Sequence, residues 1–472
     1  MSIANDTTPL TQAAAGRSGV ALLADGRDAF AARAHLIENA RQSIDCQCYI
    51  WRNDVSGGWL LDALRRAADR GVRVRLLLDD HNTAGLDPLL AAHDARPNFE
   101  VRLFNAHRHR RWRWLGLLGD FARLNRRMHN KALTVDGATS IVGGRNVGDE
   151  YFGAHPEMAF IDLDVFVTGE VVGRVARDFE RYWTSRSAMP ARRVVAAIPA
   201  ESCQAVFDAA QRNVQSPQAR AFAESAAASR FAQELRAGTL PLEWVRATLV
   251  SDPPLKGLGL AGRRKLLMRR LRRMLGTPQR ELLLISAYFV PTRRGMRLLL
   301  GLARRGVRIT VLTNSLEATD VAAVHAGYAG YRKALLRAGV LLYEMKRQAV
   351  FARRASRAGE SSSGSSLHAK AFCVDGERLF VGSFNFDARS VRLNTEMGLV
   401  IDSPRLVAVV THALTDVRLL GETYRVRLGR SGLEWIEQTA GGEVVHAREP
   451  NASLRRRAVV RVLSLLRIDW LL

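Results

Sequence analysis

The sequence predicts an α/β protein built from two homologous halves. Two repeated features predict it: a strand–helix–strand pattern and an eighteen-residue motif. The first occurs over residues 43–80 and again over residues 281–315. Each copy has an apolar strand, an amphipathic helix, a glycine turn (Gly71 or Gly306) and a second apolar strand. Such units imply mixed, largely parallel sheets with helices on their faces.

The eighteen-residue motif strengthens the case for two halves. It reads HNKALTVDGATSIVGGRN from His129 and HAKAFCVDGERLFVGSFN from His368, with nine of eighteen positions identical. The two motifs lie 239 residues apart, and the two glycine turns lie 235 residues apart. Because the two spacings are nearly equal, the repeat extends over a whole domain-sized unit.

The chain length of 472 residues also favours two units. An Ala-, Gln- and Glu-rich stretch between the repeats is typical of helices. The expected divisions are an N-terminal tail (1–19), a first half (20–194), a helical connecting segment (195–244), a second half (245–425) and a C-terminal extension (426–472).

Composition restricts the partners. Lysine and arginine number 70 against 46 acidic residues, so the net charge is +24. A surplus of this size favours nucleic acid, an anionic membrane or a phosphate-bearing substrate. The four cysteines lack metal-site spacing and indicate a reduced compartment. The first residues lack the features of a signal peptide, and no run approaches about 18 apolar residues, so we expect no transmembrane helix and only peripheral membrane contact.

The repeated motif carries the predicted chemistry. Each copy begins a strand, and side chains alternate along a strand, so His129 shares a face with Lys131 and His368 shares a face with Lys370. One neutral imidazole can attack phosphorus, and the other can protonate the leaving oxygen. The ammonium groups stabilise charge on the phosphate oxygens. This set suits a phosphate and suggests no metal, so we expect no cofactor.

Other residues of the two motifs are assigned supporting roles. Asn146, Asn385 and Ser383 lie in the turns GGRN and GSFN, where they are predicted to bind the substrate phosphate. Each histidine also needs an orienting carboxylate. Asp162 and Glu396 are predicted for this task, because they occupy matching places when EMGLVI is laid over DLDVFV.

Asp136 and Asp375 allow two interpretations. Both follow a valine and precede a glycine, so they can make turns at strand ends. They also complete the spacing His-x-Lys-x4-Asp in both copies, which places them among the catalytic candidates.

The doubled His-x-Lys-x4-Asp pattern resembles the phospholipase D superfamily. The phrases RLNRRMHNK, GGRNVGDEYF, GSFNFDARSVRLNTEMG and IDWLL are similar to bacterial cardiolipin synthases of the C type. The resemblance implies two phospholipase D-type αβα-sandwich halves with one shared active site at their interface. It adds Asp136 and Asp375 to the catalytic set, makes His129 the nucleophile and His368 the acid/base, and implies that no metal is used.

The resemblance also implies a substrate and a location. A phosphatidyl group would pass between phospholipids, with phosphatidylglycerol and possibly phosphatidylethanolamine as partners, to make cardiolipin. The enzyme would lie peripherally on the cytoplasmic face of a bacterial inner membrane, on an anionic surface. No nucleic-acid partner is expected, and the need for an accessory protein stays open. The alternative functions are a phospholipase D-type lipid hydrolase and, less favoured, a nuclease.

Three basic and apolar segments are predicted to dock on lipid. The first precedes His129 and contains aromatic residues among arginines. The second has the pattern of an interfacial helix with leucines at helical spacing. These segments are residues 108–127, with Trp112, Trp114, Leu117, Leu118 and Phe121; residues 263–275, with Leu267, Leu271 and Met274; and the C-terminus from Arg455 to Trp470. For the C-terminus and for residues 108–127, the alternative is that the apolar residues belong to the core and the arginines to a solvated face.

Overall fold

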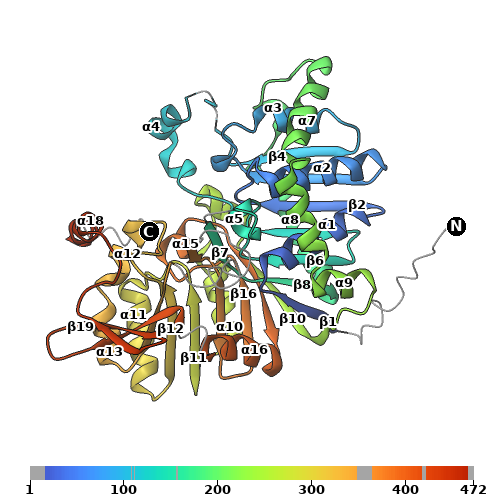
Figure 1. Ribbon diagram of the computed structural model, residues 1–472. Coiled ribbons are helices and arrows are strands. Elements are labelled where there is room, and N and C mark those ends of the chain that lie inside the picture. The colour runs from blue at the N-terminus through green and yellow to red at the C-terminus, as the bar shows by residue number, and fades with distance from the viewer. Residues whose placement is uncertain are drawn as a thin grey trace.

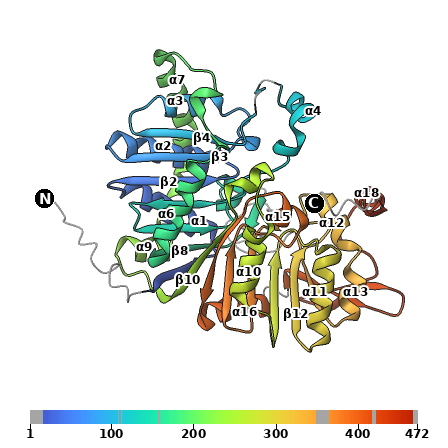
Figure 2. The ribbon, with the colours of Figure 1, turned by 180° about the vertical axis from the view of Figure 1, so that it is seen from behind.

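The computed structural model describes residues 16–107, 109–110, 112–155, 158–347, 364–416 and 421–465. Two halves of the same architecture lie one above the other in Figure 1, and the strands of the first half run across the view while those of the second run up and down. Figure 2 shows the same division from behind. The predicted mixed α/β fold with two homologous halves is confirmed.

The first half contains the residues up to the connecting helices. Its strands are β1 (Ser18–Leu23), β2 (Ser43–Cys48), β3 (Arg73–Asp79), β4 (Phe99–Phe104), β5 (Ala132–Val135), β6 (Thr139–Gly143), β7 (Met158–Ile161), β8 (Asp164–Gly169) and β9 (Ala188–Pro190). Its helices are α1 (Gly26–Glu38), α2 (Val55–Asp69), α3 (Asp87–Asp94), α4 (Arg113–Leu124), α5 (Asp149–Phe152) and α6 (Glu170–Trp183).

Three helices follow, α7 (Ala200–Val214), α8 (Pro217–Ala227) and α9 (Arg230–Arg236), and they pack on α1, α2 and α3 of the first half. The second half has strands β10 (Glu243–Ser251), β11 (Glu281–Ser286), β12 (Arg308–Asn314), β13 (Leu341–Met345), β14 (Gly364–Leu367), β15 (Lys370–Val374), β16 (Arg378–Gly382), β17 (Met397–Asp402), β18 (Thr423–Leu428), β19 (Leu433–Thr439) and β20 (Gly442–His446). Its helices are α10 (Leu267–Leu275), α11 (Thr292–Arg304), α12 (Ala322–Ala329), α13 (Arg332–Arg337), α15 (Ala388–Arg392), α16 (Pro404–Thr415) and α18 (Leu454–Leu465).

All of these strands except β7 and β14, which pair with each other, form one continuous sheet. Its order by pairing is β9-β4-β3-β2-β5-β6-β8-β1-β10-β17-β16-β15-β11-β12-β13-β18-β19-β20. The parallel ladders are β2–β3–β4 in one half and β11–β12–β13 in the other, and antiparallel strands flank them. The carboxyl ends of the parallel strands, where α/β proteins commonly bind ligands, therefore occur twice.

The two halves meet in two ways. β1 and β10 pair antiparallel at the seam of the sheet. In addition, β16 and β17 pack on β6 and β8, and the buried side chains between them, such as Val142, Val165, Val381 and Leu399, form one apolar cluster. A shared core of this kind fixes the relative position of the two motifs, because close-packed side chains tolerate little sliding.

The prediction that residues 263–275 place an apolar helix face on lipid is wrong, because that face is buried. Leu267, Leu271 and Leu275 of α10 are buried in the core of the second half, and Met274 packs against that core. The cations of the same segment, such as Arg269 and Arg272, remain exposed. The amphipathic pattern is therefore that of an ordinary surface helix.

Helix α18 at the C-terminal end has two different faces. One face packs on α12, with Val460 buried. On the other face Leu454 is 76% exposed and Val462 58% exposed. The predicted lipid contact around Trp470 lies outside the described residues.

Candidate active site

Extended segments that pair between the two halves position both histidines. The segment before His129 is extended and lies beside Thr395 of the other half: the amide of His129 donates to the carbonyl of Thr395 at 2.9 Å, and the amide of Thr395 donates to Arg127 at 2.9 Å. This pairing places the next residue of the second half, Glu396, against the His129 ring. His129 Nδ1 lies 2.9 Å from Glu396 Oε2.

The second histidine is positioned in the same way, with the roles of the two halves reversed. β14, which leads into His368, pairs parallel with β7 of the first half. The amide of His368 donates to the carbonyl of Ile161 at 2.8 Å, and His368 Nδ1 lies 2.5 Å from Asp162 Oδ2. Each imidazole is therefore oriented by a carboxylate of the opposite half.

The two lysines are buried beside their histidines. Lys131 Nζ donates to the carbonyl of His129 at 2.7 Å, and Lys370 Nζ donates to the carbonyl of His368 and lies 2.9 Å from its Nδ1. Burial lowers the pKa of Lys131 to about 7, although the charge of Glu396 opposes this shift. The pKa of Lys370 is lowered for the same first reason.

The pKa shifts of the histidines tie the two motifs into one site. Burial and then the charges of Lys131 and Lys370 lower the pKa of His129 well below its ordinary value, and His368 contributes in the same direction. Burial and Lys370 also lower the pKa of His368, whereas Asp162 raises it. Charges from both motifs therefore act on each imidazole.

The two orienting carboxylates differ. Burial alone would raise the pKa of Asp162, but the charges of His368 and Lys370 hold it below the ordinary range. Glu396 behaves in the opposite way, because burial raises its pKa to about 7 against the opposing effect of Lys131. At neutral pH, Asp162 is fully ionised and Glu396 is partly protonated.

The turn residues lie close to the site, but their contacts differ from the predicted phosphate contacts. Asn146 Nδ2 donates to Tyr151 Oη at 2.9 Å, and its Oδ1 accepts from the amide of Ile50 at 3.2 Å. Asn385 Oδ1 accepts from the amide of Tyr288 at 3.4 Å. The side-chain amides of both asparagines therefore hold the loops that follow β2 and β11.

Ser383 contacts a carboxylate where the sequence predicts a phosphate contact. Its hydroxyl donates to Glu396 Oε2 and accepts from the amide of Met397 at 3.0 Å. The first half has Gly144 at this position of the repeat. A Cβ there would lie 2.2 Å from Asp162 Oδ1, so only glycine leaves room for that carboxylate.

Asp136 and Asp375 lie away from the histidines, at the far ends of β5 and β15. Both have positive φ, 53° and 55°, and both accept backbone amides of the neighbouring chain. The donors are Arg41, Gln42 and Ser43 for Asp136, and Gln279, Arg280 and Glu281 for Asp375. The structure thus corrects their place in the catalytic set: their geometry is that of turn residues.

Aromatic rings around the histidines were missed by the sequence reasoning. The ring of Tyr49 lies 5.0 Å from His129, and those of Tyr151 and Phe160 lie 5.3 Å and 5.2 Å from His368. Lys131 Nζ lies 5.2 Å from the Tyr49 ring. The signal for Tyr49 is its place just after a parallel strand, and Tyr151 lies in the phrase GGRNVGDEYF.

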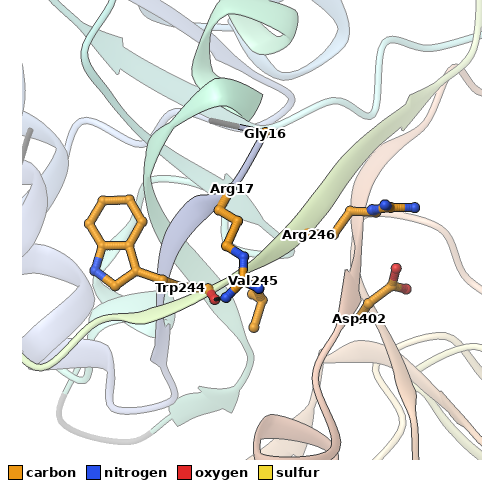
Figure 3. Close-up of a pocket in the computed structure, with 6 residues that line it drawn as sticks. All are labelled: Gly16, Arg17, Trp244, Val245, Arg246 and Asp402. Atoms are coloured by element: carbon orange, nitrogen blue, oxygen red, sulfur yellow. Dashed lines mark hydrogen bonds between the residues drawn. The ribbon is translucent and has the colours of Figure 1, made fainter. Parts of the chain in front are cut away.

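A separate hollow lies on the surface at the seam of the sheet. It has a volume of about 420 Å³, and Figure 3 shows its lining by Gly16, Arg17, Trp244, Val245, Arg246 and Asp402. None of the predicted site residues lines it, so it is distinct from the histidine site.

Within the described part of the chain, no three His, Cys, Asp or Glu residues are grouped so that they can hold a metal ion. Among the same residues, no helix is both long and apolar enough to cross a bilayer.

Comparison with known proteins identifies the family. Residues 34–183 and 271–417 match the family model described as "Cardiolipin synthase, PLD-like domain". Cardiolipin synthase C of Escherichia coli (strain K12) is 46% identical over 477 residues, covering 100% of this chain and 99% of that protein. The major cardiolipin synthase ClsA of Bacillus subtilis (strain 168) is 25% identical over 386 residues, covering 81% of this chain and 65% of that protein.

A solved structure has the same fold. Phosphatidylserine synthase of Haemophilus influenzae Rd KW20 matches with a TM-score of 0.61 at 14% identity, covering 96% of this chain and 95% of that one. Together with the crossed histidine–carboxylate pairs and the family match, this shows that the chain belongs to the cardiolipin synthase family of phospholipase D-type phosphatidyltransferases.

Proposed function

We propose that this enzyme makes cardiolipin by transferring a phosphatidyl group from one phospholipid to the headgroup hydroxyl of phosphatidylglycerol. The observation that carries the proposal is the pair of buried histidines, each held by a carboxylate of the other half and each beside a lysine. Two histidines around one phosphate allow a displacement in two steps, because one can attack while the other handles the proton.

The electrostatics favour His129 as the nucleophile. A nucleophilic imidazole must be neutral, and the strongly lowered pKa of His129 keeps it so. A general acid must be protonated. Burial and Lys370 lower the pKa of His368, but the ionised Asp162 opposes this shift and favours the protonated form. The assignment therefore follows from the difference between the two carboxylates.

The transfer takes place in two displacement steps. His129 Nε2 attacks phosphorus, the bond to the headgroup oxygen breaks, and His368 gives its proton to that oxygen. The hydroxyl of phosphatidylglycerol then attacks the phosphohistidine and loses its proton to His368, and the phosphorus–nitrogen bond breaks. Lys131 and Lys370 stabilise the negative oxygens in both steps. The donor is phosphatidylglycerol or phosphatidylethanolamine.

We propose further that the enzyme docks peripherally on an anionic membrane, at the cytoplasmic face of the bacterial inner membrane. Helix α4 projects from the first half in Figures 1 and 2, and Phe121 on it is 54% exposed. Leu260, 70% exposed, follows Gly259, whose Cα faces the guanidinium of Arg126 next to α4. Exposed cations continue at Arg263 and Arg264. Apolar and cationic side chains together suit an anionic lipid surface.

Product analysis tests the transfer. The purified full chain is given vesicles of labelled phosphatidylglycerol, with and without phosphatidylethanolamine, and the products are separated by mass spectrometry. We expect labelled cardiolipin, also in the presence of EDTA. Release of glycerol or ethanolamine depends on the donor and identifies it. Phosphatidic acid as the only product would replace the proposal with hydrolysis.

Vesicle binding tests the docking surface. Phe121→Glu with Leu260→Glu should weaken sedimentation with anionic vesicles and slow turnover on vesicles, while turnover on a soluble short-chain substrate stays the same. Val409→Glu, on the exposed face of α16, is the matched control, because Val409 is 52% exposed. Unchanged vesicle binding of the double variant would exclude this surface.

A further inference from the structure

Arg127 is a buried cation with an unbonded guanidinium nitrogen. It is 2% exposed, and its buried Nη1 donates no hydrogen bond to any residue that the structure describes. Asp79 lies 3.6 Å away, but its oxygens accept the amides of His81 at 2.9 Å and Met128 at 2.7 Å. Buried guanidinium groups are normally satisfied by several acceptors, so Nη1 of Arg127 is available to an acceptor from a ligand.

Its position relative to the nucleophile is fixed by the backbone. Residues 127–129 are extended beside Thr395, so the side chains of Arg127 and His129 leave the strand on the same side, about 7 Å apart. Met128, between them, points the other way into a buried cluster with Phe104 and Tyr182. Arg127 therefore lies next to the reacting phosphate.

Other cations converge on the same place. Burial lowers the pKa of His81, and three nearby guanidinium groups lower it further, to about 4. These groups belong to Arg127, to Arg113 of α4 and to Arg389 of α15 in the second half. Arg389 donates to the side-chain and backbone oxygens of Asn125, which are neutral. Its charge also acts on the carboxyl of Asp387, whose pKa burial raises to about 6 against the opposing effect of Arg389.

The neighbouring acids accompany these cations. Asp79 faces Arg127, and Arg110 binds Asp80 at 2.6 Å and 2.8 Å and also binds Asp87. Arg113 donates to the carbonyl of Asp80 at 2.7 Å, while its distance to that carboxylate is 3.7 Å. Among the described residues, Arg113, Arg127 and Arg389 thus donate no hydrogen bond to a carboxylate, and they gather at the carboxyl ends of β2 and β3, where a parallel sheet binds ligands.

The second half lacks this feature. The residue two positions before His368 is Ser366, whose hydroxyl lies 3.4 Å from Asn314 Oδ1. Asn314 also binds the backbone of Leu367 on both sides, at 2.8 Å. At the matching place, one half thus presents a guanidinium with an unbonded nitrogen and the other a neutral, satisfied hydrogen-bond network.

We propose that Arg127, with Arg389, forms a second anion subsite that holds the acceptor lipid's own phosphate while its glycerol hydroxyl attacks the phosphohistidine. This inference rests on the proposed function. The two phosphates of the product are joined through a glycerol, a chain about as long as two peptide units, or about 7 Å. That length is similar to the spacing of the Arg127 and His129 Cα atoms along the extended segment. Water and simple alcohols lack this phosphate, so the subsite selects transfer over hydrolysis.

The test measures how the phosphohistidine is partitioned. The full chain is supplied with a short-chain donor and one of three acceptors: short-chain phosphatidylglycerol, glycerol or water. For Arg127→Gln we expect the ratio of transfer to phosphatidylglycerol over hydrolysis to fall about 10- to 100-fold, the effect of one charge-assisted contact. The ratio of transfer to glycerol over hydrolysis should stay within about threefold.

Two variants and one ligand complete the design. Arg389→Gln should lower the same ratio less, and it serves if Arg127→Gln does not fold. Arg102→Gln is the matched control, because Arg102 on β4 is held by Glu100 and by the carbonyl of Trp183. Inorganic phosphate is added as a competitor, to separate a site for a lipid headgroup from one for free phosphate.

The outcomes separate the two proposals. Equal losses for all three acceptors, or no loss for phosphatidylglycerol, would overturn the subsite. Competition by inorganic phosphate without any acceptor preference would also overturn it, because the site would then bind free phosphate. A wild-type enzyme that forms no cardiolipin refutes the proposed function. In that case, inhibition of hydrolysis by glycerol 3-phosphate, weakened in Arg127→Gln, still tests the anion site.

Discussion

The two halves share a backbone design but differ around their histidines. On the side of His129, a glutamate with a raised pKa is held by Ser383. On the side of His368, an aspartate with a lowered pKa has a glycine, Gly144, at the place of that serine. The proposed mechanism gives the two imidazoles of this duplicated site different roles, and the different carboxylates beside them support that difference.

Replacing the histidines has the largest expected effect on this comparison. His129→Ala and His368→Ala should each lower turnover by at least about a thousandfold, because the two imidazoles serve one reaction. They should differ in one respect: His368→Ala can still form phosphohistidine on His129 from a donor with a good leaving group. Mass spectrometry of acid-quenched protein detects it. An adduct on His368 alone, found in His129→Ala, would reverse the two roles.

The next effect concerns Gly144 and Ser383, which occupy equal places in the repeat. Gly144→Ala puts a methyl group 2.2 Å from the present position of Asp162 Oδ1, so the carboxylate must leave His368. We expect turnover to fall by about 10²- to 10⁴-fold, as when an orienting carboxylate is lost. Ser383→Ala removes one hydrogen bond to Glu396 and should cost only about 10-fold.

Turnover with a soluble substrate measures both variants, and melting temperatures show whether they fold. If Gly144→Ala keeps normal turnover, Asp162 does not need its present place. If the serine variant loses more than the glycine variant, the order of importance of the two carboxylates is reversed.

Much of the site was predictable because it is local in sequence. His129 and Lys131 lie two residues apart on one strand, and the second motif repeats this spacing, so alternation alone brings each pair together. Asp162 and Glu396 were found by aligning the repeat. The crossing of the partners was not predictable, because it depends on β7 and β14 pairing between the halves.

Other predictions were wrong, and the structure shows the reasons. The leucines of α10 have the pattern of both an interfacial helix and an ordinary one, and only the tertiary packing shows that Leu271 is buried. Ser383 lies in a turn that suits an anion, but its hydroxyl turns to a carboxylate. The sequence did not indicate a role for Arg127, because it is one arginine among many basic residues. Only a structure shows that its buried Nη1 lacks a hydrogen-bond partner.

A smaller effect is expected in the pH dependence of turnover, through the titration of Lys131. Burial lowers its pKa to about 7, so the charge is lost as the pH rises through that value. We expect kcat/KM for a soluble phosphodiester to fall about tenfold per pH unit above this point, because kcat/KM follows the free enzyme. Lys131→Arg keeps its charge at all these pH values. Its absolute rate should be lower, but its alkaline decline should begin at a higher pH. An identical alkaline decline in both enzymes would assign it to another group.

The smallest expected effect distinguishes the turn aspartates from the catalytic set. Asp375 accepts three backbone amides. Burial would raise its pKa, but these hydrogen bonds from Arg280, Glu281 and Gln279 hold it below the ordinary value. Its ionised form therefore stabilises the fold above the ordinary pKa of aspartate, and this contribution is lost as the pH falls through the lowered value.

Asp375→Asn keeps the oxygen acceptor and tolerates the positive φ of 55°, so it removes little except the charge. We expect the free energy of unfolding at pH 7 to fall by about 1 kcal/mol or less, because the carboxylate is partly exposed to solvent. The difference from the wild type should shrink toward about pH 3. Denaturant unfolding at several pH values measures this. Turnover should stay within about twofold of the wild type, since the residue lies at the end of β15 away from His368. A loss of turnover comparable to that of a histidine variant, in a protein of normal stability, would return Asp375 to the catalytic set and make the two ends of the strand parts of one functional unit.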